Sequence, residues 1–137
     1  METDGANASA TIDNAHLLSR LGMRDVEETS DRLVIEMDNR PDFANIRGAL
    51  QGGLVATLID IAAGRLAGTV VGPDQDVTTA DMNVHYLAPI MQGPARAEAT
   101  IVRAGRRLIV LSVDVTDAGR DRLAARATLT FAVLEPR

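Results

Sequence analysis

A chain of 137 residues, 46% of them hydrophobic, is long enough for one hydrophobic core and too short for two comfortable domains, so we expect a single domain. A net charge of −5 and only three aromatic residues argue against a polyanion-binding surface and against stacking platforms for nucleic-acid bases. The lack of cysteine excludes a disulfide framework and a thiolate metal site, and two isolated histidines cannot build a zinc centre alone. We therefore predict neither a nucleic-acid partner nor a bound metal.

The first residues are small, polar and acidic, without the basic start and apolar run of a secretory signal. We expect residues 1–12 to be flexible and residues 13–137 to form the domain. The longest strongly apolar stretch contains Thr57, Asp60 and Arg65 and is shorter than the roughly 20 residues that a membrane-spanning helix needs. These features predict a soluble, cytoplasmic protein without a membrane segment.

The first third of the domain contains a predicted short helix, a strand and a long loop. Leucines at helical spacing predict the helix at 13–23, with Asp13 or Asn14 as its cap. Alternating apolar and polar residues predict a strand at 31–37. Residues 38–53 carry one proline and three glycines, which predicts a loop, and a loop this long in a small domain is more often functional than idle.

The rest of the domain is predicted to be one long helix followed by four strands. Apolar residues recur at helical intervals from Leu54 to about Gly68 and leave little polar surface, so we expect this helix to be buried nearly all round. Short, turn-rich connections suited to hairpins separate the predicted strands, which are 77–87, 94–104, 107–116 and 122–134. The predicted fold class is α+β, with the helix in the concave face of a strongly twisted antiparallel sheet.

One stripe of the predicted helix carries small residues and a single acid. Burying an unpaired carboxylate costs several kcal/mol or raises its pKa, so Asp60 needs a partner. A neighbouring backbone group or an arginine would give it a structural role, whereas a substrate would give it a catalytic one, and the helix alone leaves both open. The stripe consists of Gly53, Ala56, Thr57, Asp60, Ala63, Gly64 and Ala67.

The start of the helix favours the catalytic interpretation. Gly52 and Gly53 offer backbone N–H groups unobstructed by side chains at a helix N-terminus, where partial positive charge suits an oxyanion. Gln51 has an amide that could donate to a carbonyl oxygen. The structural alternatives are an ordinary glycine-rich helix start and a simple cap residue.

The distance between the two features predicts a second chain. Asp60 lies eight residues beyond Gly52, about 12 Å along a helix axis, so the two cannot contact one reacting carbonyl. Two helices running antiparallel about a two-fold axis would place Asp60 of one chain beside the Gly52-Gly53 turn of the other. We therefore expect a homodimer with two equivalent sites made from both chains.

Three segments together carry a family resemblance. They are Asn45-x-x-Gly48-x-x-Gln51-Gly52-Gly53, then Asp60, then Asp81-Met82-Asn83-Val84-x-Tyr86-Leu87-x-Pro89. This combination resembles the hotdog-fold acyl-CoA thioesterases, and within them the PaaI-like branch named for phenylacetate degradation. The resemblance spans residues 31–133. It implies a long central helix wrapped by a five- to six-stranded antiparallel sheet, a homodimer paired into a tetramer as a dimer of dimers, and hydrolysis of an acyl-CoA thioester.

The resemblance also implies roles for individual residues. Asp60 matches the catalytic carboxylate, acting as nucleophile or as base for water, and Gly53 matches the backbone donor to the thioester carbonyl. Asn45 matches a loop residue near the acyl site, and Thr79 a hydroxyl that in some members positions the water. Strict alternation puts Thr79 on the strand face opposite Met82, so it should point away from the helix unless a bulge or the second subunit intervenes.

Gln51 stands where the PaaI-like pattern usually has histidine. Glutamine can still polarise a carbonyl by donating a hydrogen bond, and some related hotdog thioesterases use it in this way. Unlike histidine, it cannot exchange a proton near neutral pH, so we expect a different pH dependence.

A cluster of arginines is a candidate binding surface for the phosphates of CoA. Arg103, Arg106 and Arg107 surround the turn at Gly105, and guanidinium groups bind phosphate well. Solvated charges on a turn are the structural alternative.

The remaining candidates predict little additional chemistry. His85 has no acid and hydroxyl at nucleophile-triad spacing, which favours a structural or surface role. No strand-to-helix junction carries a P-loop or dinucleotide fingerprint, so we predict no organic cofactor beyond the CoA of the substrate. The competing functional hypothesis is a non-catalytic acyl-CoA binding or sensing protein. A hotdog hydratase would need a paired Asp and His on the site loop, and the sequence has no such pair there.

Overall fold

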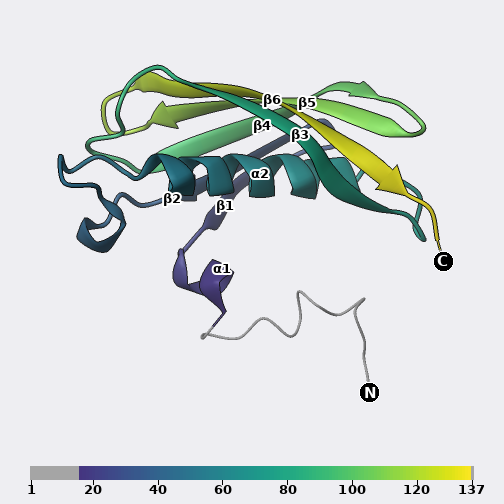
Figure 1. Cartoon of the computed structure of the whole chain (residues 1–137), viewed down its shortest axis with the longest axis horizontal. Helices are drawn as coiled ribbons and strands as arrows, with labels where there is room; N and C mark the ends of the chain where they lie inside the picture. Colours follow the sequence, from purple (N-terminus) through teal and green to yellow (C-terminus); the bar gives the residue numbers. More distant parts are fainter. Residues whose placement is uncertain (1–15, 137) are drawn as a thin grey trace.

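The computed structural model describes residues 16–136, which form one long helix against a six-stranded antiparallel sheet (Figure 1). The strands lie in the order β1-β2-β4-β5-β6-β3. The predicted α+β architecture, with a long central helix and a five- to six-stranded sheet, is confirmed. The elements are α1 (Leu17–Arg20), β1 (Arg24–Glu28), β2 (Arg32–Met37), the 3-10 turn η2 (Pro41–Phe43), α2 (Gly52–Gly68), β3 (Asp76–Tyr86), β4 (Ala95–Ala104), β5 (Leu108–Asp117) and β6 (Arg122–Leu134).

The five predicted strands all form, with ends within one residue of those expected. Alternation explains this agreement: along β5 every second residue from Ile109 to Val115 is at most 1% exposed and faces the core. On β6 the alternate residues Ala125, Ala127, Leu129 and Phe131 are buried, while Leu123 and Val133 are only half-buried. Each fully buried large aliphatic side chain contributes about 1.5–3 kcal/mol, so these central strands provide much of the core.

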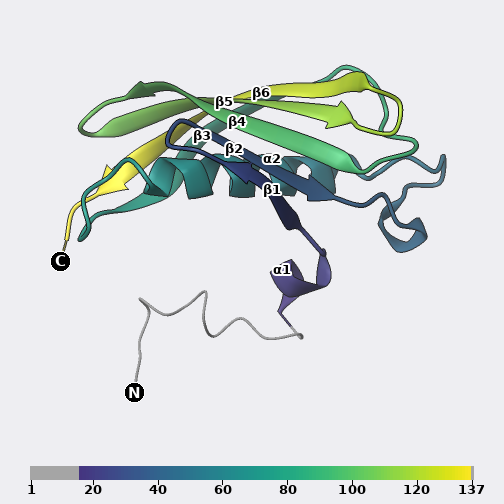
Figure 2. The ribbon, with the colours of Figure 1, turned by 180° about the vertical axis from the view of Figure 1, so that it is seen from behind.

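The helix α2 lies along the concave side of the sheet, as Figures 1 and 2 show from opposite sides. It starts at Gly52, two residues earlier than predicted, because the Gln51 carbonyl accepts from the N–H groups of Leu54 and Val55. The prediction that it is buried nearly all round is wrong for the single chain, since the sheet covers only one side of it. The buried residues are Val55, Leu58, Ile59, Ala62, Ala63, Leu66 and Ala67.

The N-terminal elements differ from the expectation. Of the described part of the helix predicted at 13–23, only α1 is helical, and the chain then forms β1, which pairs with β2. All five β1 side chains are exposed, so this strand has no apolar alternation to reveal it in the sequence. His16 caps α1 by accepting from the Leu18 N–H at 3.1 Å. The predicted caps Asp13 and Asn14, and the predicted flexible segment, lie outside the described residues.

The strand β3 forms one edge of the sheet. It pairs with β6 along its length, and among residues 16–136 no strand covers its other edge. The pairing contains a β-bulge, because Thr79 lies opposite Phe131 whereas Asp81 lies opposite Thr130, which leaves Ala80 as the extra residue. Within the described range, no helix is both long enough and apolar enough to cross a membrane.

Candidate active site

The start of α2 presents backbone donors to open space. The N–H groups of Leu54 and Val55 bond the Gln51 carbonyl at 3.0 and 3.1 Å, whereas those of Gly52 and Gly53 have no acceptor within the described part of the chain. A Cβ atom added at Gly53 would meet nothing within 4 Å, so the space beside this residue is empty. Two N–H groups at a helix N-terminus can therefore bind a carbonyl oxygen or an oxyanion here.

The loop before α2 is shaped by Asn45. Its side-chain oxygen accepts from the backbone N–H groups of Arg47 at 2.9 Å and Ala49 at 3.1 Å. Gly48 completes this turn with a φ of 86°, a conformation that favours glycine. Asn45 therefore fixes the turn while its side chain lines the hollow beside the helix start.

That hollow has a volume of about 310 Å³, and we call it the helix-start pocket. Tyr86, at the end of β3, closes one side of it: its hydroxyl donates to the Gly52 carbonyl at 2.8 Å, and its ring lies 3.5 Å from the position of a Cβ at Gly52. The sequence motif contained Tyr86 but did not reveal this contact, which joins residues 34 positions apart. The lining residues are Asn45, Ala49, Leu50, Gly52, Val55, Tyr86, Leu87, Ala88, Pro89, Ile90 and Ala124.

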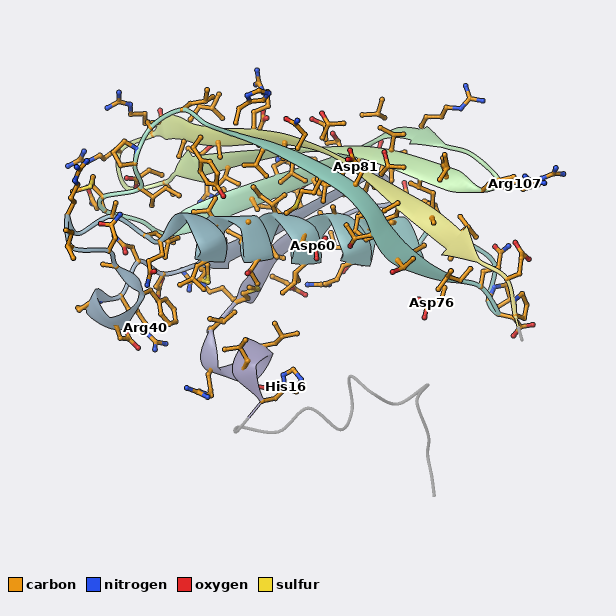
Figure 3. All side chains as sticks on the ribbon, in the orientation of Figure 1. His16, Arg40, Asp60, Asp76, Asp81 and Arg107 are labelled. Atoms are coloured by element: carbon orange, nitrogen blue, oxygen red, sulfur yellow. The ribbon has the colours of Figure 1, made fainter. Side chains whose placement is uncertain are left out.

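Asp60 lies near the middle of α2, half-buried, with β3 running past it (Figure 3). The Thr79 hydroxyl donates to Asp60 Oδ1 at 2.8 Å. No arginine or backbone group bonds this carboxylate among the described residues, so the structural partners expected from sequence do not occur there. The second carboxylate oxygen, Oδ2, is left to accept from another group.

Thr79 would point away from the helix if the alternation were strict, but the bulge, one of the two exceptions considered for this residue, occurs. The extra residue Ala80 shifts the alternation by one, so Thr79 faces α2 before the bulge and Tyr86 faces it after the bulge. Strict alternation over the whole strand cannot show such a shift.

A second hollow of about 500 Å³, the Asp60 groove, opens beside this pair. It shares no lining residue with the helix-start pocket, so one chain carries the acid and the backbone donors in two separate hollows. The Asp60 groove is mainly apolar, with two carboxylates and one guanidinium. Its lining residues are Leu18, Asp60, Ile61, Gly64, Arg65, Asp76, Val77, Thr78, Thr79 and Phe131.

The three candidate arginines lie at the β4–β5 hairpin, apart from both hollows. Arg103, Arg106 and Arg107 are all exposed, and none forms an ion pair with a described acid. Figure 3 shows Arg107 at the end of the hairpin, far from the middle of α2. His85 is exposed on β3. Over residues 16–136 no cluster of three or more His, Cys, Asp or Glu side chains is placed to bind a metal.

Comparison with known proteins identifies the family. The family model of the thioesterase superfamily matches residues 47–124, which are more than half of the chain and include Asp60, Thr79 and Tyr86. A candidate esterase of Saccharolobus solfataricus is 30% identical over 106 residues, which are 77% of this chain and 74% of that protein. Acyl-coenzyme A thioesterase 13 of Mus musculus is 33% identical over 107 residues, which are 77% of this chain and 75% of that protein.

A solved structure supports the same conclusion at the level of the fold. A thioesterase of Haemophilus influenzae has a TM-score of 0.84 at 21% identity, covering 98% of this chain and 92% of that one. The chain belongs to the thioesterase superfamily, has the hotdog fold and is a thioester hydrolase by class. Its assignment to the PaaI-like branch stays a prediction.

Proposed function

We propose that the protein is an acyl-CoA thioesterase, which hydrolyses a CoA thioester to a free acid and CoA at sites shared between two chains. The observation that carries the proposal is the separation of the two reacting parts. Asp60, held by Thr79, lines one hollow, whereas Gly52, the residue before Gly53, lines another. Seven residues of helix, about 10.5 Å along its axis, separate Asp60 from Gly53 within one chain.

Two uncovered surfaces support a two-fold dimer. The edge of β3 presents unpaired backbone groups, which a second β3 could pair by continuing the sheet. The less buried side of α2 carries Gly53 and Ala56, small residues that let two helices approach closely. In such a dimer Asp60 lies beside the helix start of the partner subunit. The family resemblance further supports pairing of two dimers into a tetramer.

The proposed chemistry begins at the carbonyl of the bound thioester. The Gly53 N–H, aided by the Gln51 amide, polarises the carbonyl oxygen. In one route Asp60 of the other chain takes a proton from water as the water oxygen attacks the carbonyl carbon. The resulting oxyanion is stabilised by the Gly53 N–H. The C–S bond then breaks, and CoA leaves as a thiolate that takes a proton.

In the alternative route an Asp60 oxygen attacks the carbonyl carbon directly. CoA leaves as thiolate, and water hydrolyses the resulting acyl–Asp60 anhydride. The contact with Thr79 fits both routes, because the hydroxyl orients the carboxylate through Oδ1 and leaves Oδ2 for the water or the carbonyl carbon. A positioned base supplies about 10²- to 10⁴-fold and one oxyanion donor about 10²- to 10³-fold, so both parts are required.

Replacing Thr79 with valine is expected to lower kcat by roughly 10- to 100-fold. Valine keeps the shape but loses the donor to Asp60, and a hydrogen bond to a charged group contributes about 1.5–3 kcal/mol. The matched control is Thr79→Ser, which keeps the hydroxyl and is expected to retain most of the activity. Steady-state thiol release measures both variants, and equal rates for Thr79→Val and wild type would remove Thr79 from the site.

The hairpin arginines are proposed to bind the phosphates of CoA. Replacing both Arg106 and Arg107 with glutamine is expected to raise KM for an acyl-CoA by about 3- to 10-fold, since each exposed charge contributes less than about 1 kcal/mol. The same acyl group on pantetheine, which lacks the nucleotide, serves as the control substrate, and its KM should not change. An equal rise in KM for both substrates would contradict phosphate binding.

A thiol-release assay against a panel of acyl-CoA esters tests the proposed function. Turnover of at least one ester supports it, whereas measurable binding of acyl-CoA without turnover of any would favour the non-catalytic binding protein. Repeating the assay with Gln51→His tests the alignment at the loop, because a histidine that restores the usual family pattern should raise the rate and introduce a titration near neutral pH.

A further inference from the structure

Asn39, two residues after β2, bonds several segments near the helix-start pocket. Its Nδ2 lies 3.2 Å from the Gly48 carbonyl oxygen, 3.2 Å from that of Ile90 and 3.1 Å from that of Met91. Only the amino end of the amide can face three carbonyl oxygens, so the orientation of the side chain is fixed by chemistry. Two N–H groups serve three acceptors, which means that at least one hydrogen is shared.

These bonds join two segments that line the helix-start pocket, one through Ala49 and Leu50 and the other through Pro89 and Ile90. Gly48 belongs to the loop that leads into α2, and Ile90 belongs to the segment that follows β3. The Ile90 carbonyl also accepts from the Leu50 N–H at 3.0 Å, two residues before the helix begins. Asn39 therefore fixes the loop directly through Gly48 and indirectly through Ile90 and Leu50.

The segment after β3 is also held from its other side. The fully buried carboxylate of Asp117 accepts from the N–H groups of Met91, Gln92 and Gly93 at 3.0, 3.1 and 2.8 Å. With Asn39 bonding its carbonyl groups and Asp117 its N–H groups, the segment cannot shift without breaking several bonds. It is a rigid support against which the loop before α2 is placed.

The packing around Asn39 leaves little freedom. A Cβ added at Gly93 would lie 3.1 Å from both the Cβ and the backbone nitrogen of Asn39. Asn39 Oδ1 is buried and bonds no group within the described part of the chain, which costs free energy. This cost offsets part of the gain from the three donor contacts.

We propose that Asn39 is a positioning residue for thioester hydrolysis, which fixes the turn that presents the Gly53 amide and the Gln51 side chain. The inference rests on the proposed role of the helix start as the carbonyl-binding site. Donors to an oxyanion act only when they are placed correctly before the reaction, and a misplacement of about 1 Å can cost about 10²-fold in rate.

The test compares Asn39→Leu, which keeps the approximate shape and removes both donors, with wild type in the thiol-release assay. We expect kcat per folded chain to fall by about 10- to 100-fold while KM changes by less than about 3-fold. Asn39→Ala, which removes the donors without adding bulk, is the second variant should the leucine prevent folding. Leu33→Ala, in the core at the opposite end of β2, is the control that lowers the thermal unfolding midpoint without lowering kcat.

A double-variant comparison separates positioning from general destabilisation. If Asn39 acts through the turn, adding Gln51→Ala to Asn39→Leu will cost less than the product of the two single losses. A loss of kcat in the double variant equal to the product of the two single losses would overturn the inference, and so would an unchanged kcat in both Asn39 variants. The variant Gly53→Pro shows whether a negative result concerns only the role of Asn39 or the proposed function as well. If that variant loses activity while the Asn39 variants keep theirs, only the inference fails, whereas full activity of Gly53→Pro overturns both.

Discussion

Replacing Asp60 with asparagine is expected to lower kcat by about 10²- to 10⁴-fold while the protein stays folded. Asparagine keeps an oxygen that accepts from the Thr79 hydroxyl, but it can neither take a proton from water nor attack a thioester. Because Asp60 is half-buried and forms no ion pair with a described residue, the change removes little packing. Thiol release measures the loss, and thermal unfolding checks the fold.

The matched control for Asp60 is Asp76→Asn. Asp76 lines the same groove, but its carboxylate accepts from the N–H of Val77 at 2.8 Å, next to it in the chain. This variant should keep kcat within a few-fold of wild type. Equal losses in the two variants would mean that the groove needs negative charge in general rather than a reacting carboxylate at Asp60.

Replacing Asp117 with alanine is expected to lower the free energy of unfolding by on the order of 3–5 kcal/mol. The variant removes the acceptor of three N–H groups, of which that of Gly93 is buried and those of Met91 and Gln92 are partly buried. Each unsatisfied buried group costs about 1–3 kcal/mol. Urea unfolding at neutral pH measures the difference. Asp114→Ala on the same strand removes only a partly exposed ion pair with Arg126 and should cost less than about 1 kcal/mol. Similar costs for the two variants would contradict the role given to Asp117.

The stabilisation by Asp117 should disappear in acid. Burial acts to raise the pKa of this carboxyl, but the backbone N–H groups of Gln92, Gly93, Met91 and Gly119 together hold the pKa below its ordinary value. A carboxyl with a lowered pKa stabilises the fold above its unfolded-state pKa of about 3.9, and this contribution is lost as the pH falls through the folded-state pKa. The difference between wild type and Asp117→Ala should therefore narrow below about pH 4.

The periodic part of the fold was accessible from sequence, and the exceptions have physical causes. Hydrophobic alternation located five strands, most clearly β5, where every second residue is buried. It missed β1, whose side chains are all exposed. Strict alternation assigned Thr79 to the wrong face of β3, because a bulge changes the face on which the following side chains lie and leaves no mark in the amino-acid pattern. Asp60 is less buried than expected, because a sheet can cover only one side of a helix.

The part of the site whose residues are neighbours in the sequence was predictable. Gln51, Gly52 and Gly53 are neighbours, so a helix start rich in donors was visible as a short motif. The supports around it were not visible, because Asn39 bonds Met91 across 52 positions and Asp117 bonds Gly93 across 24. A single sequence carries no signal that pairs such distant polar residues.

Mixing two inactive variants tests the shared site most directly. Asp60→Asn lacks the carboxylate, and Gly53→Pro lacks the N–H donor at a first-turn position where a helix tolerates proline. Gly53→Ala, which keeps the donor and has room for its Cβ, should stay active. In a mixed dimer one site would combine the intact Gly53 of one chain with the intact Asp60 of the other.

Random exchange of equal amounts makes half of the dimers mixed, each with one of its two sites restored, so activity should return to about one quarter of wild type. Separate affinity tags on the two variants would show that mixed dimers have formed. Mixed dimers that remain as inactive as either parent would contradict a site built from two chains.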